Sequence, residues 1–587
     1  MKSLLRLKPY LLRYRKTLLL GILTVVGSNL FSVVQPLLLG YAVDELKTGT
    51  ENNTYVTDSL MMWAFYIVGF SLVAGFFTYL TRQTLIVTSR HIEFDLRNDF
   101  LAHLQKLHYP YFQNKPTGDL MAHATNDIAA VRNVLGPGIM YPSDTLMTFT
   151  MVLTMMLVTD WQLTLYALIP LPLVSIVVYK LSKAVHEKFN ERQEQFSKLT
   201  TKAQENLSGI RVIKAYVREL FEIDQFRTIS WEYLKKNLVL ALVQSIMWPL
   251  MFVLVGFSIL MVLYFGGVRV IDGIISIGTL TAFFGYLVML IWPMIAFGWV
   301  ANLLQQGAAS MARLAKILDT VPEIRDTETT NHAVTAVRGE IEFRNVTFAH
   351  KNTEKPTLKN INIKIESGMT LAIIGYTGSG KTTLVNLIAR LYDTTEGVIM
   401  IDGTPIANVP VAVLRSSIGY VPQETFLFSE TIAENIRYGV DNHFDEERLR
   451  RSADIAQISK DVMEFPKQFE TMIGERGITL SGGQKQRTSI ARALMREPNI
   501  LILDDALSCV DTYTEEEILK RLHEFMKGRT SIIISHRIST VKEADVICVL
   551  DNGQIVERGT HDELVAHDGI YAHLHEKQLL EQELEEM

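Results

Sequence analysis

The sequence contains few cysteines, few charges and few of the residues that break regular structure. Cys509 and Cys548 are the only two cysteines among 587 residues. They could form at most one bridge, so a disulfide-stabilised scaffold is excluded. The 35 glycines and 17 prolines are too few for a collagen-like or low-complexity chain. Charged residues make up 20%, below the roughly 25% of an average soluble protein. A net charge of −6 gives no support for nucleic-acid binding, so we expect no nucleic-acid partner.

Long apolar runs, by contrast, are present, and all of them lie in the first half of the chain. A helix needs about 20 mostly apolar residues to cross a bilayer. Six segments meet this requirement, at residues 17–40, 59–81, 138–159, 161–180, 239–265 and 277–300. No comparable segment follows residue 301. The pattern predicts a membrane bundle of six transmembrane helices.

The charges beside these segments predict their orientation. The first sixteen residues carry only basic charges, which favours a cytoplasmic N-terminus. The first loop between spans lacks a basic excess, so we expect it outside. The charged stretches 82–137 and 181–238 then fall inside, as long cytoplasmic extensions of the helices. We expect a multi-pass protein of the cytoplasmic (inner) membrane, in contact with membrane lipids.

The composition changes after residue 320. Short β-rich runs, such as 370–375 and 500–504, alternate with helical patterns, which is typical of a soluble α/β domain. We expect a transmembrane domain at 1–320, a linker at 321–338, a soluble α/β P-loop nucleotide-binding domain at 339–578 and an acidic tail at 579–587.

A glycine-rich motif follows the β-run at 370–374. It consists of Gly375, Tyr376, Thr377, Gly378, Ser379, Gly380, Lys381, Thr382 and Thr383. The motif fits the P-loop pattern in its strand–loop–helix context, where backbone N–H groups face phosphates. Lys381 would contact the β- and γ-phosphates, and Thr382 would supply a hydroxyl to Mg²⁺.

Asp504 ends a second apolar run and is predicted to complete the site. Residues 500–503 are all isoleucine or leucine, which indicates a buried strand with the carboxylate at its end. An acidic residue at this position reaches Mg²⁺ in P-loop enzymes. The residues therefore predict ATP and Mg²⁺ as cofactors.

A further motif lies between these two and resembles a known family. Leu480, Ser481, Gly482, Gly483 and Gln484 are similar to the signature of the ATP-binding cassette (ABC) family. Gln423 resembles the Q-loop, and the segment 471–477 with Glu475 resembles the X-loop of exporters. Residues 508–511 resemble the D-loop, and His536 resembles the switch histidine. The resemblance implies a type-I exporter half-transporter, closest to bacterial multidrug-resistance-like proteins. It also implies catalytic roles for Asp505, His536 and Gln423, with Gln423 a further ligand of Mg²⁺.

The signature segment has a physical role of its own. Ser481 and the amides of Gly482 and Gly483, at a predicted helix N-terminus, form an anion site suited to a γ-phosphate. In the family this site faces the P-loop of a second cassette. One cassette per chain therefore implies a dimer with a second half-transporter.

Two positions depart from the family pattern. Family ATPases have Glu where this chain has Asp505, which is shorter by one methylene, and an error of ~1 Å can cost about 10²-fold in rate. The adenine-stacking position, usually Tyr, is His350; an exposed strand-end residue is the alternative reading. Asp505 beside an intact signature resembles one subunit of a heterodimer whose partner carries Glu. The alternative is a slow homodimer.

The membrane half is less informative. Asp144 lies inside a predicted span, where it either pairs with a cationic ligand or bonds to another helix. Met and aromatic residues gather on the fifth and sixth spans and suit apolar ligands that vary in shape. Residues 109–131 and 205–217 resemble coupling-helix regions. The leading function is ATP-driven export of amphipathic small molecules. The alternatives are a lipid or peptide exporter and a nucleotide-gated channel or regulatory subunit with little ATP turnover.

Overall fold

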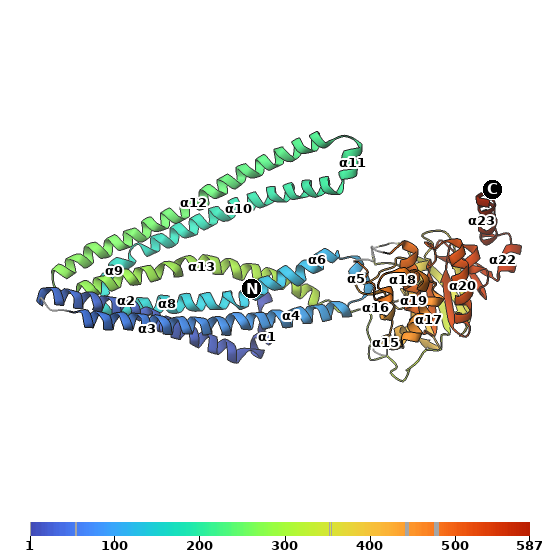
Figure 1. The fold of residues 1–587 in the computed structure, drawn as a ribbon, viewed down its shortest axis with the longest axis horizontal. Helices are drawn as coiled ribbons and strands as arrows, with labels where there is room; N and C mark the ends of the chain where they lie inside the picture. Colours follow the sequence, from blue (N-terminus) through green and yellow to red (C-terminus); the bar gives the residue numbers. More distant parts are fainter. Residues whose placement is uncertain are drawn as a thin grey trace. The chain divides into compact units, whose positions relative to one another are not determined.

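The chain divides into two compact units. The computed structural model describes residues 2–52, 56–351, 353, 355–440, 445–474 and 480–586. Unit 1 comprises Met1–Gln105 and Thr117–Thr320, and unit 2 comprises Lys106–Pro116 and Val321–Met587. Figure 1 shows the elements along the chain.

The described part of unit 1 is built from helices. In chain order they are η1 (Lys2–Leu7), α1 (Lys8–Arg13), α2 (Arg15–Asn52), α3 (Thr57–Thr81), η2 (Arg82–Ile86), α4 (Val87–Lys106), α6 (Thr117–Ala122), η3 (His123–Asp127), α7 (Ile128–Leu135), α8 (Pro137–Thr159), α9 (Trp161–Leu168), α10 (Leu171–Ser208), α11 (Ile210–Ala215), α12 (Glu219–Ile271) and α13 (Ile277–Leu318). The short helices η1 and α1 were not predicted from the sequence. The basic side chains there form ion pairs within the unit, Arg6 with Asp319 and Arg13 with Asp95.

Each predicted apolar segment lies on helical backbone, with one interruption. Among the described residues, three helical segments can cross a membrane by length and composition, namely Arg15–Glu51, Thr57–Lys106 and Ile277–Leu318. The predicted span 161–180 is divided between α9 and α10 by a turn at residues 169 and 170. Pro170 and Pro172 account for the break, because proline lacks an N–H and restricts the residue before it. The count of six spans stays a prediction.

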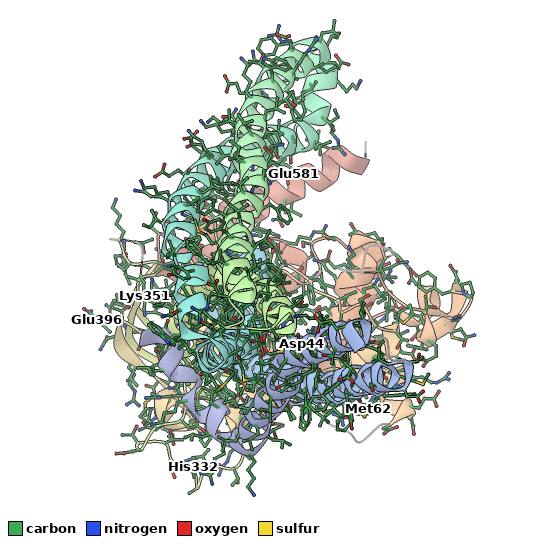
Figure 2. All side chains as sticks on the ribbon, turned by 90° about the vertical axis from the view of Figure 1, so that its left-hand side faces the viewer. Asp44, Met62, His332, Lys351, Glu396 and Glu581 are labelled. Atoms are coloured by element: carbon green, nitrogen blue, oxygen red, sulfur yellow. The ribbon has the colours of Figure 1, made fainter. Side chains whose placement is uncertain are left out.

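Two long helices extend side by side from the rest of unit 1. Figure 1 shows α10 and α12 as a hairpin with the short helix α11 at its tip. Figure 2 shows the side chains on the ribbon, among them Met62 on α3, which is 44% exposed. Many other apolar side chains of α3, such as Phe65 and Leu72, are exposed, as expected of a helix that faces lipid.

Buried polar bonds connect the helices of unit 1. Asn29 on α2 donates from Nδ2 to Oδ1 of Asp144 on α8 over 2.8 Å. This is the interhelical bond that was one of the two readings of Asp144. On the other side of the predicted membrane boundary, Asp127 in η3 pairs with Arg313 on α13.

Unit 2 contains two sheets. The first is antiparallel, in the order β2-β1-β4-β5, and consists of β1 (Ile341–Phe348), β2 (Leu358–Ile365), β4 (Glu396–Ile401) and β5 (Thr404–Pro405). The second has the order β10-β9-β3-β8-β7-β6 and consists of β3 (Thr370–Ile374), β6 (Ile418–Val421), β7 (Ile500–Asp504), β8 (Thr530–Ile534), β9 (Val546–Asp551) and β10 (Gln554–Gly559). In the second sheet β10 alone is antiparallel to its neighbour among the described strands. Strands β7 and β8 are buried at every position, as expected of parallel strands covered on both faces.

Helices surround these sheets. They are α5 (Tyr109–Gln113), α14 (Lys381–Ile388), η4 (Ile406–Asn408), α15 (Val411–Ser416), α16 (Ile432–Arg437), α17 (Glu446–Ile455), α18 (Ser459–Glu464), η5 (Gln468–Glu470), α19 (Gly482–Met495), α20 (Thr512–Met526), α21 (Ile538–Val541), α22 (His561–Ala566) and α23 (Ile570–Glu586). The predicted acidic tail from residue 579 is the continuation of α23, and its Leu580 and Leu584 are exposed.

The short helix α5 packs within unit 2. The ring of Tyr109 meets Tyr392 edge to face at 5.9 Å between centroids. The Tyr392 hydroxyl donates to Oε1 of Gln113 over 2.7 Å. The predicted coupling region 109–131 is therefore divided, since only its first part belongs to unit 2.

Candidate nucleotide site

The candidate site lies at one edge of the second sheet. Strands β3, β8, β7 and β6 are parallel neighbours, so their C-terminal ends meet at the same edge. A predicted site residue follows or ends each of them, namely Gly375, His536, Asp504 and Gln423. Ligands of open α/β sheets bind at this edge.

The P-loop joins β3 to α14. Gly375, Gly378 and Gly380 have φ angles of +151°, +83° and +105°. A Cβ atom on Gly375 would lie 2.1 Å from the carbonyl oxygen of Leu550, so no larger residue fits there. The loop thus brings its backbone close to the start of α14, where N–H groups are available to phosphate.

Lys381 is buried inside this loop. Its Nζ donates to the carbonyl oxygens of Gly375 and Tyr376, over 2.8 and 2.9 Å. Burial lowers the pKa of Lys381, while the carboxylates of Asp505 and Asp504 act to raise it. The Ser379 hydroxyl is buried and has no hydrogen-bond partner among the residues that the structure describes. A cation and an unsatisfied hydroxyl inside a glycine loop suit an anionic ligand.

Thr382 and Asp504 meet where a magnesium ion would bind. The Thr382 hydroxyl donates to Oδ1 of Asp504 over 3.2 Å. The other carboxylate oxygen, Oδ2, is buried and finds no partner in the described part of the chain. Burial is the main cause that raises the pKa of Asp504 to about 6. An orphaned carboxylate oxygen beside a hydroxyl fits Mg²⁺, which takes one or two carboxylates together with substrate phosphates. Gln423, the third predicted ligand, is exposed in a bend after β6.

Asp505 and His536 lie close enough to Lys381 for their charges to affect one another. Asp505 has a φ of +51°, and its N–H donates to the Ile534 carbonyl over 2.9 Å at the end of β8. Burial lowers the pKa of His536, the Lys381 charge lowers it further and the Asp505 carboxylate opposes both. The structure therefore brings Lys381, Asp505 and His536 together.

The signature segment is organised separately. Leu480 is buried in the core of the helical layer, and Ser481 is the N-cap of α19. Ser481 and Gln484 form a capping box, with the Gln484 N–H 3.2 Å from the Ser481 hydroxyl. Gln484 also donates to Asp461 over 2.8 Å. Among the described residues, the side-chain hydrogen bonds of Ser481 and Gln484 do not reach the P-loop of the same chain.

The D-loop lies directly against the start of α19. A Cβ atom on Gly483 would be 2.9 Å from the Cys509 carbonyl oxygen. The buried Gln486 accepts from the Cys509 N–H over 2.9 Å and donates to the Ser508 hydroxyl over 3.0 Å. This connection was not predicted from the sequence, because nothing in the local pattern distinguishes Gln486 from other polar helix residues.

His350 lies just beyond β1. Its ring is edge-on to Phe348 and Tyr392, at 4.9 and 5.3 Å between centroids. The aromatic surroundings are compatible with a stacking role, which stays a prediction. Glu475, predicted in the X-loop, lies outside the described residues.

A long helical membrane unit followed by a P-loop α/β unit defines the class of membrane-bound transport ATPases. Comparison with known proteins gives the family. Residues 18–294 match the model of the ABC transporter transmembrane region, and residues 358–508 match that of the ABC transporter. The chain belongs to the ABC transporter family. It is a multi-pass membrane protein that binds ATP and couples its hydrolysis to export.

Several relatives are similar along almost the whole chain. The probable multidrug resistance ABC transporter ATP-binding/permease protein YheI of Bacillus subtilis (strain 168) is 39% identical over 98% of this chain and 96% of its own. The multidrug resistance-like ATP-binding protein MdlA of Escherichia coli (strain K12) is 36% identical over 100% and 98%. The ATP-dependent lipid A-core flippase of Syntrophus aciditrophicus (strain SB) is 36% identical over 88% and 85%. A solved bacterial Atm1-family ABC exporter with ATP bound has a TM-score of 0.81 and 25% identity, over 96% of this chain and 99% of that one.

Proposed function

We propose that this chain is one half of a dimeric exporter that moves amphipathic compounds outward across the cytoplasmic membrane. The observation that carries the ATP-driven step is the convergence of Lys381, Asp505 and His536 at the sheet edge where Asp504 meets Thr382. Two relatives named for multidrug resistance support the substrate class.

Each residue of the site has a role in this proposal. Lys381 neutralises the phosphate charge, and the P-loop amides hold the phosphates. Thr382, Asp504 and Gln423 would hold Mg²⁺, which would neutralise charge on the phosphates. Asp505 orients the attacking water, and His536 contacts the terminal phosphate. His350 stacks on the adenine.

The contrast between an intact signature segment and the shorter Asp505 in the chain's own site supports a heterodimer. Among the described residues, the side chains of Ser481 and Gln484 bond to each other and to Asp461 rather than to their own P-loop. The segment Ser481–Gln484 would instead complete the site of a partner that carries Glu. This chain's own site contains the shorter Asp505 and would turn over slowly. The slow symmetric homodimer is the competing assembly.

Inside-out vesicles that contain the complex test the transport step. With Mg·ATP they should accumulate an amphipathic dye against its gradient, because the pump moves it into the lumen. Vesicles in which Lys381 and the corresponding P-loop lysine of the partner are both replaced by Ala should not accumulate it. A downhill ion conductance on ATP addition without accumulation would support the channel alternative instead.

A lipid exporter is the second candidate, since one relative is named a lipid A-core flippase. A fluorescent-lipid protection assay in the same vesicles distinguishes the two. ATP-dependent lipid movement without dye accumulation would favour the lipid substrate.

A further inference from the structure

The C-terminal helix α23 is anchored beside the loop that carries His536. Its Ile570, Tyr571 and Leu574 pack in one apolar cluster with Ile538 and Val541 of α21. Tyr571 is fully buried, and its hydroxyl lies 2.8 Å from Nδ1 of His561. Side chains four residues apart lie on the same helix face, so Gln578 continues the face that Ile570 and Leu574 begin.

Gln578 holds the main chain of this loop with both ends of its amide. Its Oε1 accepts from the Ile538 N–H over 2.8 Å. Its Nε2 donates to the His536 carbonyl oxygen over 2.5 Å. The amide can make both bonds in only one orientation, because a rotated amide would place its NH₂ against an N–H and its oxygen against a carbonyl. In Figure 2 Glu581 marks α23, less than one turn beyond Gln578.

Arg537, which lies between His536 and Ile538 in the chain, is held by a different helix. Arg537 forms an ion pair with Glu515 of α20. The Glu515 side chain is only 3% exposed. Glu515 also accepts from the Thr540 hydroxyl over 2.6 Å. The loop between β8 and α21 is thus fixed by α20 through Arg537 and by α23 through Gln578.

We propose that Gln578 is a positioning residue for His536, so that recognition of the terminal phosphate depends on the docked C-terminal helix. The inference rests on the role of His536 stated under the proposed function. Gln578 bonds to the backbone of His536 and not to its imidazole. Loss of Gln578 therefore leaves the imidazole chemically unchanged but removes one of the two attachments that fix the loop and orient the ring. The ability to bind ADP, which depends on the P-loop, should stay unchanged.

The experiment compares ATP and ADP at this chain's own site. The purified complex is labelled with a photoreactive azido-ATP, and the labelling of this chain is competed with ATP and with ADP. The variants are Gln578→Met, His536→Ala and the double variant, with Lys577→Met as the control. Lys577 is adjacent on α23 but its side chain is 72% exposed and pairs only at 3.7 Å with Glu581. Thermal unfolding of each variant checks that the fold is kept.

We expect Gln578→Met to lower the preference for ATP over ADP about fivefold, the effect of one or two lost hydrogen bonds. Gln578→Glu, which keeps the acceptor for the Ile538 N–H, should lose less, and Lys577→Met should lose nothing. If Gln578 acts through His536, the double variant will match His536→Ala alone, because the two effects are not additive. Additive losses, or an unchanged preference in Gln578→Met, would overturn the inference while leaving the proposed function intact. An unchanged preference in His536→Ala would instead contradict the proposed role of His536.

Discussion

The Cys509 N–H donates to Oε1 of Gln486 over 2.9 Å, which fastens the D-loop to the second turn of the signature helix α19. Nε2 of the Gln486 side chain donates to the Ser508 hydroxyl, and Gln486 is only 4% exposed. In a dimer whose signature serves the partner's nucleotide, this bond would couple the position of the D-loop to that of Ser481. Gln486 is therefore the first residue to test.

Gln486→Leu should lower both stability and turnover. The change removes the hydrogen bonds of Gln486 with the Cys509 N–H, the Ser508 hydroxyl and the Asp505 carbonyl oxygen. We therefore expect a loss of about 1–2 kcal/mol in the free energy of unfolding. The D-loop would then shift, and misplacement by ~1 Å is expected to reduce kcat by about tenfold or more. ATPase assays and thermal unfolding of the assembled complex measure both effects. Ser508→Ala removes one of these three bonds of Gln486 and should lose less. Equal activity of Gln486→Leu and the parent complex would contradict the coupling.

Asp127 makes the stability of unit 1 depend on pH in the acid range. Burial alone would raise its pKa, but hydrogen bonds from Arg313, His123 and Ser310 lower the pKa of Asp127 to about 2. A carboxylate with a depressed pKa stabilises the fold above its ordinary pKa of about 3.9, and this contribution is lost as the pH falls towards 2.

Asp127→Asn should therefore destabilise the protein at neutral pH by about 1 kcal/mol, after allowance for solvent screening. The difference from the parent protein should shrink as the pH falls from about 4 towards 2. Denaturant unfolding of the complex in detergent across this range measures it. The control is Asp119→Asn, since Asp119 is half exposed and lies 3.6 Å from His123. A difference that grows on acidification would show that Asp127 does not act through its charge.

Lys381→Ala should weaken ATP binding at this chain's own site. The lysine is a buried cation inside the phosphate loop, and hydrogen bonds between charged partners contribute more than neutral ones. We expect a decrease in affinity of about tenfold to a hundredfold. Competition of azido-ATP labelling on this chain provides the measurement. Unchanged affinity would reject the P-loop assignment.

Asp504→Asn should change the magnesium requirement of the same site. One oxygen of the carboxylate bonds to Thr382, and the other has no partner among the described residues, so it is free to bind a metal ion. The variant should need more Mg²⁺ for half-maximal ATP labelling, whereas labelling without added Mg²⁺ should change little. Asp545→Asn is the matched control, because Asp545 accepts from the Thr370 N–H at the opposite end of β3. The same Mg²⁺ dependence in both variants would remove Asp504 from the metal site.

Local sequence patterns predicted the strand, glycine loop and helix around Lys381 and the strand that ends in Asp504. A short apolar run ending in a carboxylate is typical of a buried parallel strand, and a glycine loop between a strand and a helix is typical of a P-loop. The contacts made by Gln486 and Gln578 could not be predicted in this way. They join segments that lie 23 and 42 residues apart, through a single polar side chain each. The break before α10 was missed because the hydropathy of residues 161–180 is continuous, although Pro170 and Pro172 lie within it.

The signature segment of this chain matches the family pattern, whereas its own nucleotide site has Asp505 in place of Glu. Ser481 caps α19 with its hydroxyl and would present the signature to a partner's site, whereas Asp505 belongs to the chain's own site. Ser481→Arg would place bulk and charge where the terminal phosphate must lie in line for transfer. ATPase activity of the complex should then fall to near background. Ser481→Asn, which keeps an N-cap residue, controls for loss of the cap.

Asp505→Asn should have a much smaller effect if the partner carries Glu. It removes a carboxylate that is already one methylene short, so more than about half of the turnover should survive in a heterodimer whose other site does most of the work. In a homodimer both sites depend on Asp505, and the change would abolish activity as completely as Ser481→Arg does. Parallel ATPase assays on the two variants, in the complex as it is purified from the membrane, therefore separate the assemblies. Near-complete loss in both would reject the asymmetric heterodimer in favour of a slow, symmetric pump.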